Sequence, residues 1–149
     1  MKQQICILGS TGSIGTQALE VIRQHPDRYE AYALTANNHW ELLAQQAREF
    51  HPAAVVIANE AHYEALKEAL RDEPDTKVYA GRDAVCQIVE AGPITMVLTA
   101  MVGFSGLTPT IRAIQARKTI CLANKETLVV AGELICQLAE AYRVPILPV

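Results

Sequence analysis

The sequence lacks long apolar runs, clusters of basic residues and closely spaced cysteines. Its apolar runs are short and interrupted by glycine, proline or charge, so none predicts a bilayer-spanning helix. The 13 basic residues are dispersed and the net charge is −3, which argues against nucleic-acid and membrane partners. No two of the four cysteines form a Cys-x-x-Cys pair, so a zinc knuckle and a dithiol redox motif are not indicated.

The length and composition predict one folded domain. The chain has 149 residues, of which half are apolar and 19% are charged. A chain of this size buries roughly 70% of the surface that it exposes when unfolded, and this composition is not that of a disordered protein. We therefore expect residues 1–149 to form a single domain with a hydrophobic core.

The two ends of the chain bear on its location and completeness. A glycine-rich turn begins at Gly9, which leaves too little sequence before it for a targeting segment, and we expect a cytoplasmic protein. The other end, Pro145–Val149, is an apolar run of the kind that forms a buried strand. Because domains seldom stop inside such a run, we expect the sequence to be a piece of a longer protein.

Short apolar runs alternate with segments of helical periodicity. Several runs are apolar at every position, as in strands that are buried on both faces of a parallel sheet. The predicted strands are Ile5–Leu8, Ala31–Leu34, Ala53–Ala58, Lys77–Ala80, Ile94–Leu98, Thr119–Leu122 and Pro145–Val149. Between them, apolar residues recur on one helical face, as at Ile14, Ala18, Val21 and Ile22, and we expect that face to lie on the sheet. This alternation predicts an α/β fold with a doubly wound, mostly parallel, Rossmann-like sheet and helices on both faces.

Prolines mark the ends of several predicted helices. Pro26 and Pro52 each end a helix at the histidine before them, because proline disfavours helical dihedral angles in the preceding residue. Thr108 is predicted to cap a later helix, with Pro109 at its first position.

The first predicted strand leads into Gly9–Gly15, which has the pattern Gly-x-x-Gly-x-x-Gly and precedes a predicted helix. In the related dinucleotide fingerprint, the first glycine permits a tight turn and the second lets a pyrophosphate approach the backbone. The third lets the helix pack closely against the strand. The helix N-terminus offers free N–H groups to phosphates, and Ser10, Thr11 and Ser13 add hydroxyl donors. A tight turn without a ligand is the alternative.

The segment after the second predicted strand bears on the kind of dinucleotide. Sites that prefer NAD usually place a carboxylate there to bond the ribose 2′-hydroxyl. This chain has Asn37, Asn38 and His39 instead, and their side chains can donate to a 2′-phosphate. The sequence therefore favours NADP over NAD. The alternative is that the two asparagines cap the helix that follows.

Two later strand ends are also candidates, because ligands of open α/β sheets lie outside the carboxyl ends of the strands. Residues 99–106 are small and contain glycine, so they can approach a cofactor closely. After Thr119–Leu122 come Asn124, Lys125 and Glu126. Lys125 can neutralise a phosphate, and the other two can bond polar groups of a ligand. A capped helix start is the alternative for this segment.

Three other classes of protein compete with this interpretation. A semialdehyde or acyl-phosphate dehydrogenase needs a nucleophilic cysteine in an exposed loop, whereas Cys121 and Cys136 fall inside a predicted strand and helix. A short-chain dehydrogenase would use Tyr63 and Lys67, which occur too early in the chain for that family. A non-catalytic module that senses NADP is compatible with the same residues and stays open.

Three segments together resemble the 1-deoxy-D-xylulose 5-phosphate reductoisomerase family: Gly9–Gly15, Leu122–Leu128 (Leu-Ala-Asn-Lys-Glu-Thr-Leu) and Ile146–Val149. The resemblance covers the whole chain and implies the N-terminal NADPH-binding domain of that enzyme. The family converts 1-deoxy-D-xylulose 5-phosphate to 2-C-methyl-D-erythritol 4-phosphate in non-mevalonate isoprenoid biosynthesis. It uses hydride from NADPH and a divalent metal such as Mg²⁺, Mn²⁺ or Co²⁺.

The resemblance implies roles for particular residues. The residues that would hold the NADPH pyrophosphate are Thr11, Gly12, Ser13 and Ile14. Those that would contact the adenosine ribose and its 2′-phosphate are Asn37, Asn38 and His39, where many members have Gly-Lys-Asn. Further along the chain, the implied NADPH contacts are Asn124 and Glu126. Lys125 would contact the phosphate of the sugar substrate.

The metal ligands of the family begin directly after its Leu-Pro-Val segment, which is where this sequence stops. The resemblance therefore implies that residues 1–149 contain no catalytic residue and no metal ligand. We expect this chain to bind NADPH without converting the sugar phosphate. The resemblance also implies that the full-length enzyme is a homodimer.

Overall fold

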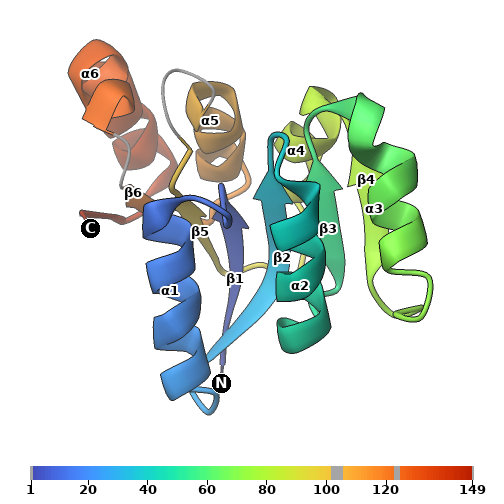
Figure 1. The fold of residues 1–149 in the computed structure, drawn as a ribbon. Coiled ribbons are helices and arrows are strands. Elements are labelled where there is room, and N and C mark those ends of the chain that lie inside the picture. Colours follow the sequence, from blue (N-terminus) through green and yellow to red (C-terminus); the bar gives the residue numbers. More distant parts are fainter. Residues whose placement is uncertain (1, 102–105, 123–124, 149) are drawn as a thin grey trace.

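The computed structural model describes residues 2–101, 106–122 and 125–148, and for residues 125–132 and 148 it describes the backbone alone. Strands and helices alternate along the chain (Figure 1). The strands are β1 (Gln3–Leu8), β2 (Tyr29–Ala36), β3 (Ala54–Ile57), β4 (Lys77–Ala80), β5 (Met96–Thr99), β6 (Thr119–Leu122) and β7 (Ile146–Pro148). The helices are α1 (Ser13–Gln24), α2 (Trp40–Phe50), the short 3-10 helix η1 (Glu60–His62), α3 (Tyr63–Ala69), α4 (Arg82–Ile88), α5 (Leu107–Gln115) and α6 (Lys125–Tyr142).

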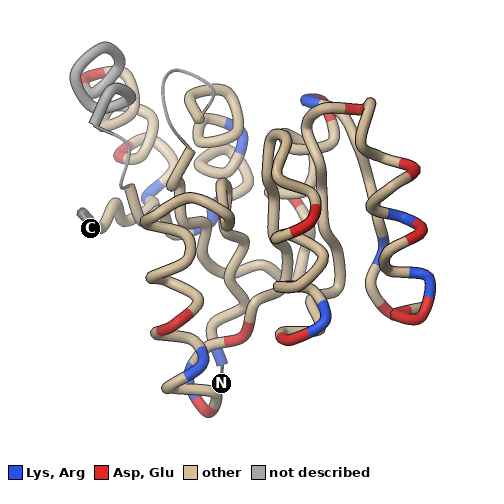
Figure 2. The backbone as a smooth tube through the Cα atoms, viewed as in Figure 1, with Lys and Arg blue, Asp and Glu red and all other residues tan. Residues whose placement is uncertain are grey.

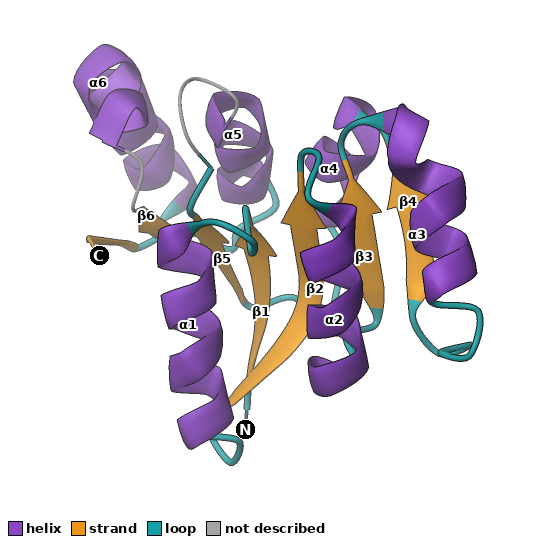
Figure 3. Ribbon diagram, viewed as in Figure 1, coloured by secondary structure: helices purple, strands orange, loops and turns teal. Residues whose placement is uncertain are grey.

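All seven strands belong to one parallel sheet (Figure 3). Their order across the sheet is β4-β3-β2-β1-β5-β6-β7, and each neighbouring pair is parallel. Helices α1, α2 and α3 lie on one face, and α4, α5 and α6 lie on the other (Figure 1). The predicted doubly wound, Rossmann-like α/β fold is therefore confirmed.

The sheet is buried on both faces because successive side chains of a strand point to opposite sides. Along β1, Ile5 and Ile7 pack with residues of α1, α2 and α3, whereas Cys6 and Leu8 pack with residues of α4, α5 and α6. All four side chains are buried. A strand that is buried on both faces needs apolar residues at every position, which explains the uninterrupted run in the sequence.

The strand order reverses beside β1, which has β2 on one side and the much later strand β5 on the other. In open parallel sheets, the crevice outside the carboxyl ends of the strands at such a point is where ligands bind. The segments that leave β1 and β5 approach each other there, since a Cβ built on Gly9 would lie 3.0 Å from the carbonyl carbon of Ala100. Gly9, the first glycine of the turn, therefore lies at the point of the sheet edge where the strand order reverses.

The predicted elements match the observed ones except in two places. Helix α4 was not predicted, because it is short and buries one side chain, Val85, which is too little to show a helical period. The 3-10 helix η1, which directly precedes α3, was not predicted either. The predicted cap of α5 is wrong. That helix begins at Leu107 after Gly106, so Thr108 and Pro109 lie in its first turn. Proline is tolerated there because the first N–H groups of a helix have no partner within the helix.

On the face that carries α1, an apolar groove of about 410 Å³ lies beside this helix. Residues of α1 line it together with residues of β5, β6 and β7. Ile14 and Val21, which the helical spacing predicted to face the sheet, line the groove and are 37% and 48% exposed. Ile22 of the predicted stripe is buried as expected, and it shares the buried face of α1 with Gly15 and Leu19.

Charged residues are dispersed over the described surface, with acidic and basic positions interleaved (Figure 2). Several form exposed ion pairs, such as Arg71 with Glu68 and Arg112 with Glu90. Within this part of the chain, the basic positions form no cluster. Among the described helices, none combines the length and the hydropathy that crossing a membrane requires.

Candidate functional site

The turn after β1 depends on Gly9 for two reasons. Its φ angle is +90°, a conformation that residues with a Cβ rarely adopt. A Cβ would also lie 3.0 Å from the carbonyl oxygen of Ala100, at the end of β5. The Gly9 amide donates to the backbone oxygen and to the hydroxyl oxygen of Thr35, both at 3.1 Å. These contacts fix the chain as it leaves the sheet.

The other two glycines of the turn differ sharply in their surroundings. A Cβ on Gly15 would lie 2.2 Å from the Gly9 carbonyl oxygen and 2.6 Å from the Cα atom of Ser10. Gly15 therefore lets α1 pack directly on the turn. A Cβ on Gly12 would meet only the Gly9 carbonyl oxygen, at 3.8 Å, which is ordinary contact. Packing within the fold explains why Gly9 and Gly15 are glycines. It does not explain why residue Gly12 is one.

The hydroxyl groups of the turn do not all face outward. Ser10 is fully buried, and its hydroxyl donates to the side-chain oxygen of Gln46 at 2.7 Å. The Gln46 amide donates back to the Ser10 carbonyl at 2.9 Å. The prediction that Ser10 offers a hydroxyl to a ligand is therefore wrong, because the pair joins the turn to α2. Thr11 is half-buried and Ser13 is exposed.

The N-terminus of α1 is open to solvent. Gly12 is its N-cap, and the first N–H groups of the helix receive no side-chain cap. Ser13 and Ile14 are its first two residues and are both exposed. The side chain of Ile14 lines the apolar groove, so only its backbone N–H is placed to meet an anion at this end of the helix.

The loop after β2 is held by the neighbouring strand. The backbone amide of Asn59 donates to the Asn37 carbonyl at 3.0 Å, which extends the β2–β3 pairing beyond the strands. The Asn59 side-chain amide donates to the side-chain oxygen of Asn38 at 2.7 Å. His39 is the N-cap of α2, and no side chain caps this helix. The alternative in which the asparagine side chains cap α2 is therefore wrong.

The turn and the loop meet in one cavity. A cavity of about 230 Å³ is lined by Thr11 and Gly12 from the turn and by Asn37, Asn38 and His39 from the loop, with Gly9, Thr35, Ala36, Ala100 and Met101 completing it. The structure thus brings together two segments that the sequence singled out separately. Ala100 and Met101 come from the predicted segment 99–106, of which residues 102–105 lie outside the described chain.

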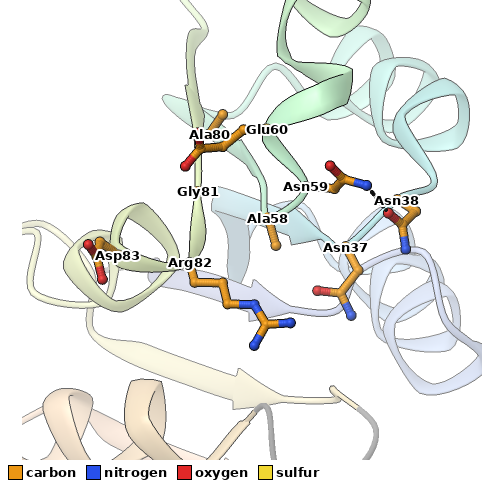
Figure 4. A pocket seen from close by; sticks show the side chains of 9 residues that line it. All are labelled: Asn37, Asn38, Ala58, Asn59, Glu60, Ala80, Gly81, Arg82 and Asp83. Atoms are coloured by element: carbon orange, nitrogen blue, oxygen red, sulfur yellow. Dashed lines mark hydrogen bonds between the residues drawn. The ribbon is translucent and has the colours of Figure 1, made fainter.

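Two further cavities continue from this site along the carboxyl ends of β3 and β4. The larger, of about 800 Å³, is lined by Asn37, Asn38, Asn59 and Arg82 among others (Figure 4). The smaller, of about 300 Å³, also has Asn37 and Arg82 in its wall. The sequence analysis did not select Asn59 or Arg82. The available signal was their position after two predicted strands: Asn59 directly follows Ala53–Ala58, and Arg82 follows Lys77–Ala80 with only Gly81 between them.

The third predicted segment follows β6, at the same edge of the sheet as the ends of β1 and β5. Asn124 lies outside the described residues. Lys125 and Glu126 are the first residues of α6, and only their backbone is described. Among the residues with described side chains, no group of three or more His, Cys, Asp or Glu could hold a metal ion.

The cysteines bear on the competing dehydrogenase class. Burial raises the pKa of the Cys6 thiol to about 12 and also raises the pKa values of Cys86 and Cys121. A raised pKa disfavours the thiolate, which is the nucleophilic form. Cys136 is exposed, but it lies on α6 rather than in a loop. The described cysteines therefore do not supply the activated thiolate that a semialdehyde dehydrogenase needs.

The parallel sheet and the glycine-rich turn place the chain in the class of Rossmann-like α/β domains. The sequence profile of the 1-deoxy-D-xylulose 5-phosphate reductoisomerase family matches residues 5–132, and the chain belongs to this family. The reductoisomerase of Bacteroides thetaiotaomicron is 74% identical over 148 residues, which make up 99% of this chain and 38% of that protein. The chain thus spans well under half of that relative's length.

Two solved structures are similar to the chain over nearly its whole length. One is the reductoisomerase of Zymomonas mobilis in complex with NADPH, with a TM-score of 0.94 and 37% identity over 99% of this chain and 38% of that one. The other is a reductoisomerase in complex with NADPH, fosmidomycin and magnesium, with a TM-score of 0.92 and 39% identity. It matches 98% of this chain and 36% of its own.

Proposed function

We propose that residues 1–149 act as one domain that binds NADPH in an enzyme converting 1-deoxy-D-xylulose 5-phosphate to 2-C-methyl-D-erythritol 4-phosphate. Family membership supports the reaction, and two similar structures contain NADPH. The observation that carries the proposal is the open space around Gly12. The fold has room for a Cβ there, so a dinucleotide pyrophosphate close to the backbone is the reason for a glycine.

The residues around Gly12 suit the cofactor. The first N–H groups of α1 have no side-chain cap, and Thr11 lies in the wall of the same cavity. In this proposal Thr11, Gly12, Ser13 and Ile14 bind the pyrophosphate with backbone N–H groups and hydroxyls. Asn37, Asn38 and His39 contact the adenosine ribose. NADPH supplies the hydride when it is bound, and the domain binds and orients it.

The remaining assignments concern the other end of the cofactor. We propose that Asn124 and Glu126 contact NADPH and that Lys125 contacts the phosphate of the sugar, because they follow β6 at the edge where β1 and β5 end. In this proposal the ligands of the divalent metal and the catalytic residues lie outside residues 1–149, as the resemblance to the family implies. The homodimer and the cytoplasmic location remain predictions of the sequence.

Titration with NADPH tests the binding part of the proposal. Trp40 is the only tryptophan and directly follows His39, so its emission reports a nucleotide bound at this loop. We expect saturable quenching of Trp40 by NADPH, with energy transfer to the reduced nicotinamide ring. A chain that is folded by circular dichroism but shows no saturable NADPH binding by fluorescence and calorimetry would contradict the proposal.

A chimera tests the reaction. The chain replaces the corresponding N-terminal segment of the Bacteroides thetaiotaomicron reductoisomerase, and NADPH oxidation is followed with 1-deoxy-D-xylulose 5-phosphate and Mg²⁺. We expect turnover by the chimera and none by the 149-residue chain alone. Binding of NADPH without turnover by the chimera would favour the sensing module instead. Turnover by the isolated chain would show that catalytic residues were wrongly placed outside it.

A further inference from the structure

We propose that Arg82 binds the 2′-phosphate of NADPH and thereby makes this chain prefer NADPH to NADH. The inference rests on the proposed function and assigns one contact within it. Sites that accept NADP commonly place an arginine near the 2′-phosphate of the ribose. The sequence provides no lysine or arginine in the segment Asn37-Asn38-His39 itself, so an arginine for this contact would have to come from elsewhere in the fold.

The structure places Arg82 beside that segment. Arg82 is the first residue of α4, directly after the carboxyl end of β4. It lines the cavities of about 800 Å³ and about 300 Å³, and Asn37 lines both of them as well. Figure 4 shows its guanidinium extending from α4 toward Asn37. A residue 45 positions away in the sequence thus faces the ribose loop because β2, β3 and β4 are neighbours in the sheet.

The guanidinium of Arg82 is available to a ligand. Other arginines of the chain are engaged, since Arg23 bonds Glu49, Arg112 bonds Glu90 and Arg48 bonds the Ala69 carbonyl. No described residue forms a hydrogen bond or an ion pair with the Arg82 side chain. A guanidinium suits a phosphate because its planar set of donors can make two parallel hydrogen bonds.

The neighbouring asparagine is oriented to assist. The side-chain oxygen of Asn38 accepts from Asn59, whose own side-chain oxygen accepts from the Ala61 amide. This chain of bonds fixes the Asn38 carboxamide, and its NH₂ group has no acceptor among the described residues. An NH₂ group held in this way is a second donor for phosphate oxygens.

The balance of charge in the cavity leaves Arg82 as the binding cation. Among the described residues, it is the only lysine or arginine in the walls of the three cavities at this edge. Two carboxylates also line the largest cavity. The Glu60 carboxylate lies against Gly81, and Figure 4 shows Asp83 pointing away from Arg82 and Asn37. Neither carboxylate neutralises the guanidinium through a direct ion pair.

Arginines beside an adenosine have a second common role, which is to stack on the adenine ring. Stacking would contribute equally to the binding of NADPH and NADH, whereas a phosphate contact would contribute only to NADPH. Comparing the two nucleotides therefore separates the roles. Adenosine 2′,5′-bisphosphate and adenosine 5′-monophosphate make the same comparison without the nicotinamide half.

The test is calorimetric titration of the wild-type chain and of Arg82→Gln, Arg82→Lys and Arg71→Gln with all four nucleotides. We expect Arg82→Gln to lower the affinity for NADPH and for the bisphosphate by about 10- to 100-fold, as for loss of a charged hydrogen-bond pair. NADH and the monophosphate should bind as before. The affinity of Arg82→Lys for NADPH should lie between those of the wild type and Arg82→Gln, because lysine keeps the charge but not the paired donors. Arg71→Gln, the matched control, removes an exposed arginine that pairs with Glu68 and should change nothing.

Each other outcome has a definite meaning. Equal weakening of NADPH and NADH by Arg82→Gln would assign Arg82 to the adenine ring and overturn the proposal. Unchanged binding of both nucleotides, or a wild-type chain that binds them equally well, would also overturn it while leaving the proposed function intact. A folded wild-type chain that binds none of the four nucleotides would instead refute the proposed function on which the assignment rests.

Discussion

The turn Gly9–Gly15 and the edge formed by Asn37, Asn38, Asn59 and Arg82 lie at the same end of the sheet but are built differently. The turn is shaped by backbone contacts, with Gly9 and Gly15 pressed against other main-chain atoms. The edge is made of exposed polar side chains with few internal partners. Packing within the fold therefore accounts for most of the turn apart from Gly12, whereas it leaves most side chains of the edge free to contact a ligand.

The largest effect that follows from this contrast is on folding. Gly15→Ala would place a Cβ 2.2 Å from the Gly9 carbonyl oxygen and force α1 away from the turn. We expect a loss of about 3 kcal/mol or more in the free energy of unfolding, at the upper end of overpacking costs. Urea denaturation followed by circular dichroism measures it. Gly92→Ala is the control, because a Cβ there meets nothing within 4 Å, and equal midpoints for the two variants would refute the packing role of Gly15.

The next largest effect concerns Gly12→Val, which should lower the affinity for NADPH and leave the stability of the fold nearly unchanged. Gly12→Val adds side-chain atoms where the fold has room but where the proposed pyrophosphate lies. We expect NADPH to bind about 10- to 100-fold more weakly, which corresponds to an overpacking cost of about 1–3 kcal/mol at the ligand. Trp40 fluorescence titration measures the affinity, and thermal unfolding of the same samples measures the stability. A variant that binds NADPH like the wild type would remove the main support for the proposed function.

A smaller effect distinguishes a buried hydroxyl from a ligand contact. Ser10→Ala removes the donor to Gln46 and leaves a buried oxygen without its partner. We expect the free energy of unfolding to fall by about 1–3 kcal/mol, while the affinity of the folded chain for NADPH stays the same. Chemical denaturation and calorimetry give the two quantities. A drop in affinity without a loss of stability would restore the ligand-facing role that the sequence suggested for Ser10.

The sequence was informative about the turn because its chemistry is local. Gly9, Gly12 and Gly15 are fixed by spacing within one strand-to-helix connection. The spacing alone therefore predicted the packing roles of Gly9 and Gly15 that the structure shows, and the ligand role that we propose for Gly12. The same holds for the strand runs, since burial on both faces demands apolar residues throughout. The spacing failed for Ile14 and Val21 because it does not say whether a neighbouring helix covers that side of α1.

The edge could not be assembled from the sequence in the same way. Asn59 and Arg82 are ordinary polar residues after short strands, and nothing in their local pattern distinguishes them from other surface residues. Their relation to Asn37 and Asn38 depends on β3 pairing with β2 and β4 pairing with β3. The capping role offered for the asparagines was wrong for a related reason, because Asn38 bonds a residue 21 positions away.

The sequence by itself therefore determined the alternation of strands and helices, the glycine-rich turn and the family to which the chain belongs. Each of these depends on residue types at short, fixed spacings. The tertiary structure decided which glycine has no packing role, which hydroxyl is buried and which arginine shares a cavity with Asn37. Those facts depend on side chains that meet across the sheet, and the order of strands in a sheet is set by packing of the whole chain rather than by any one segment.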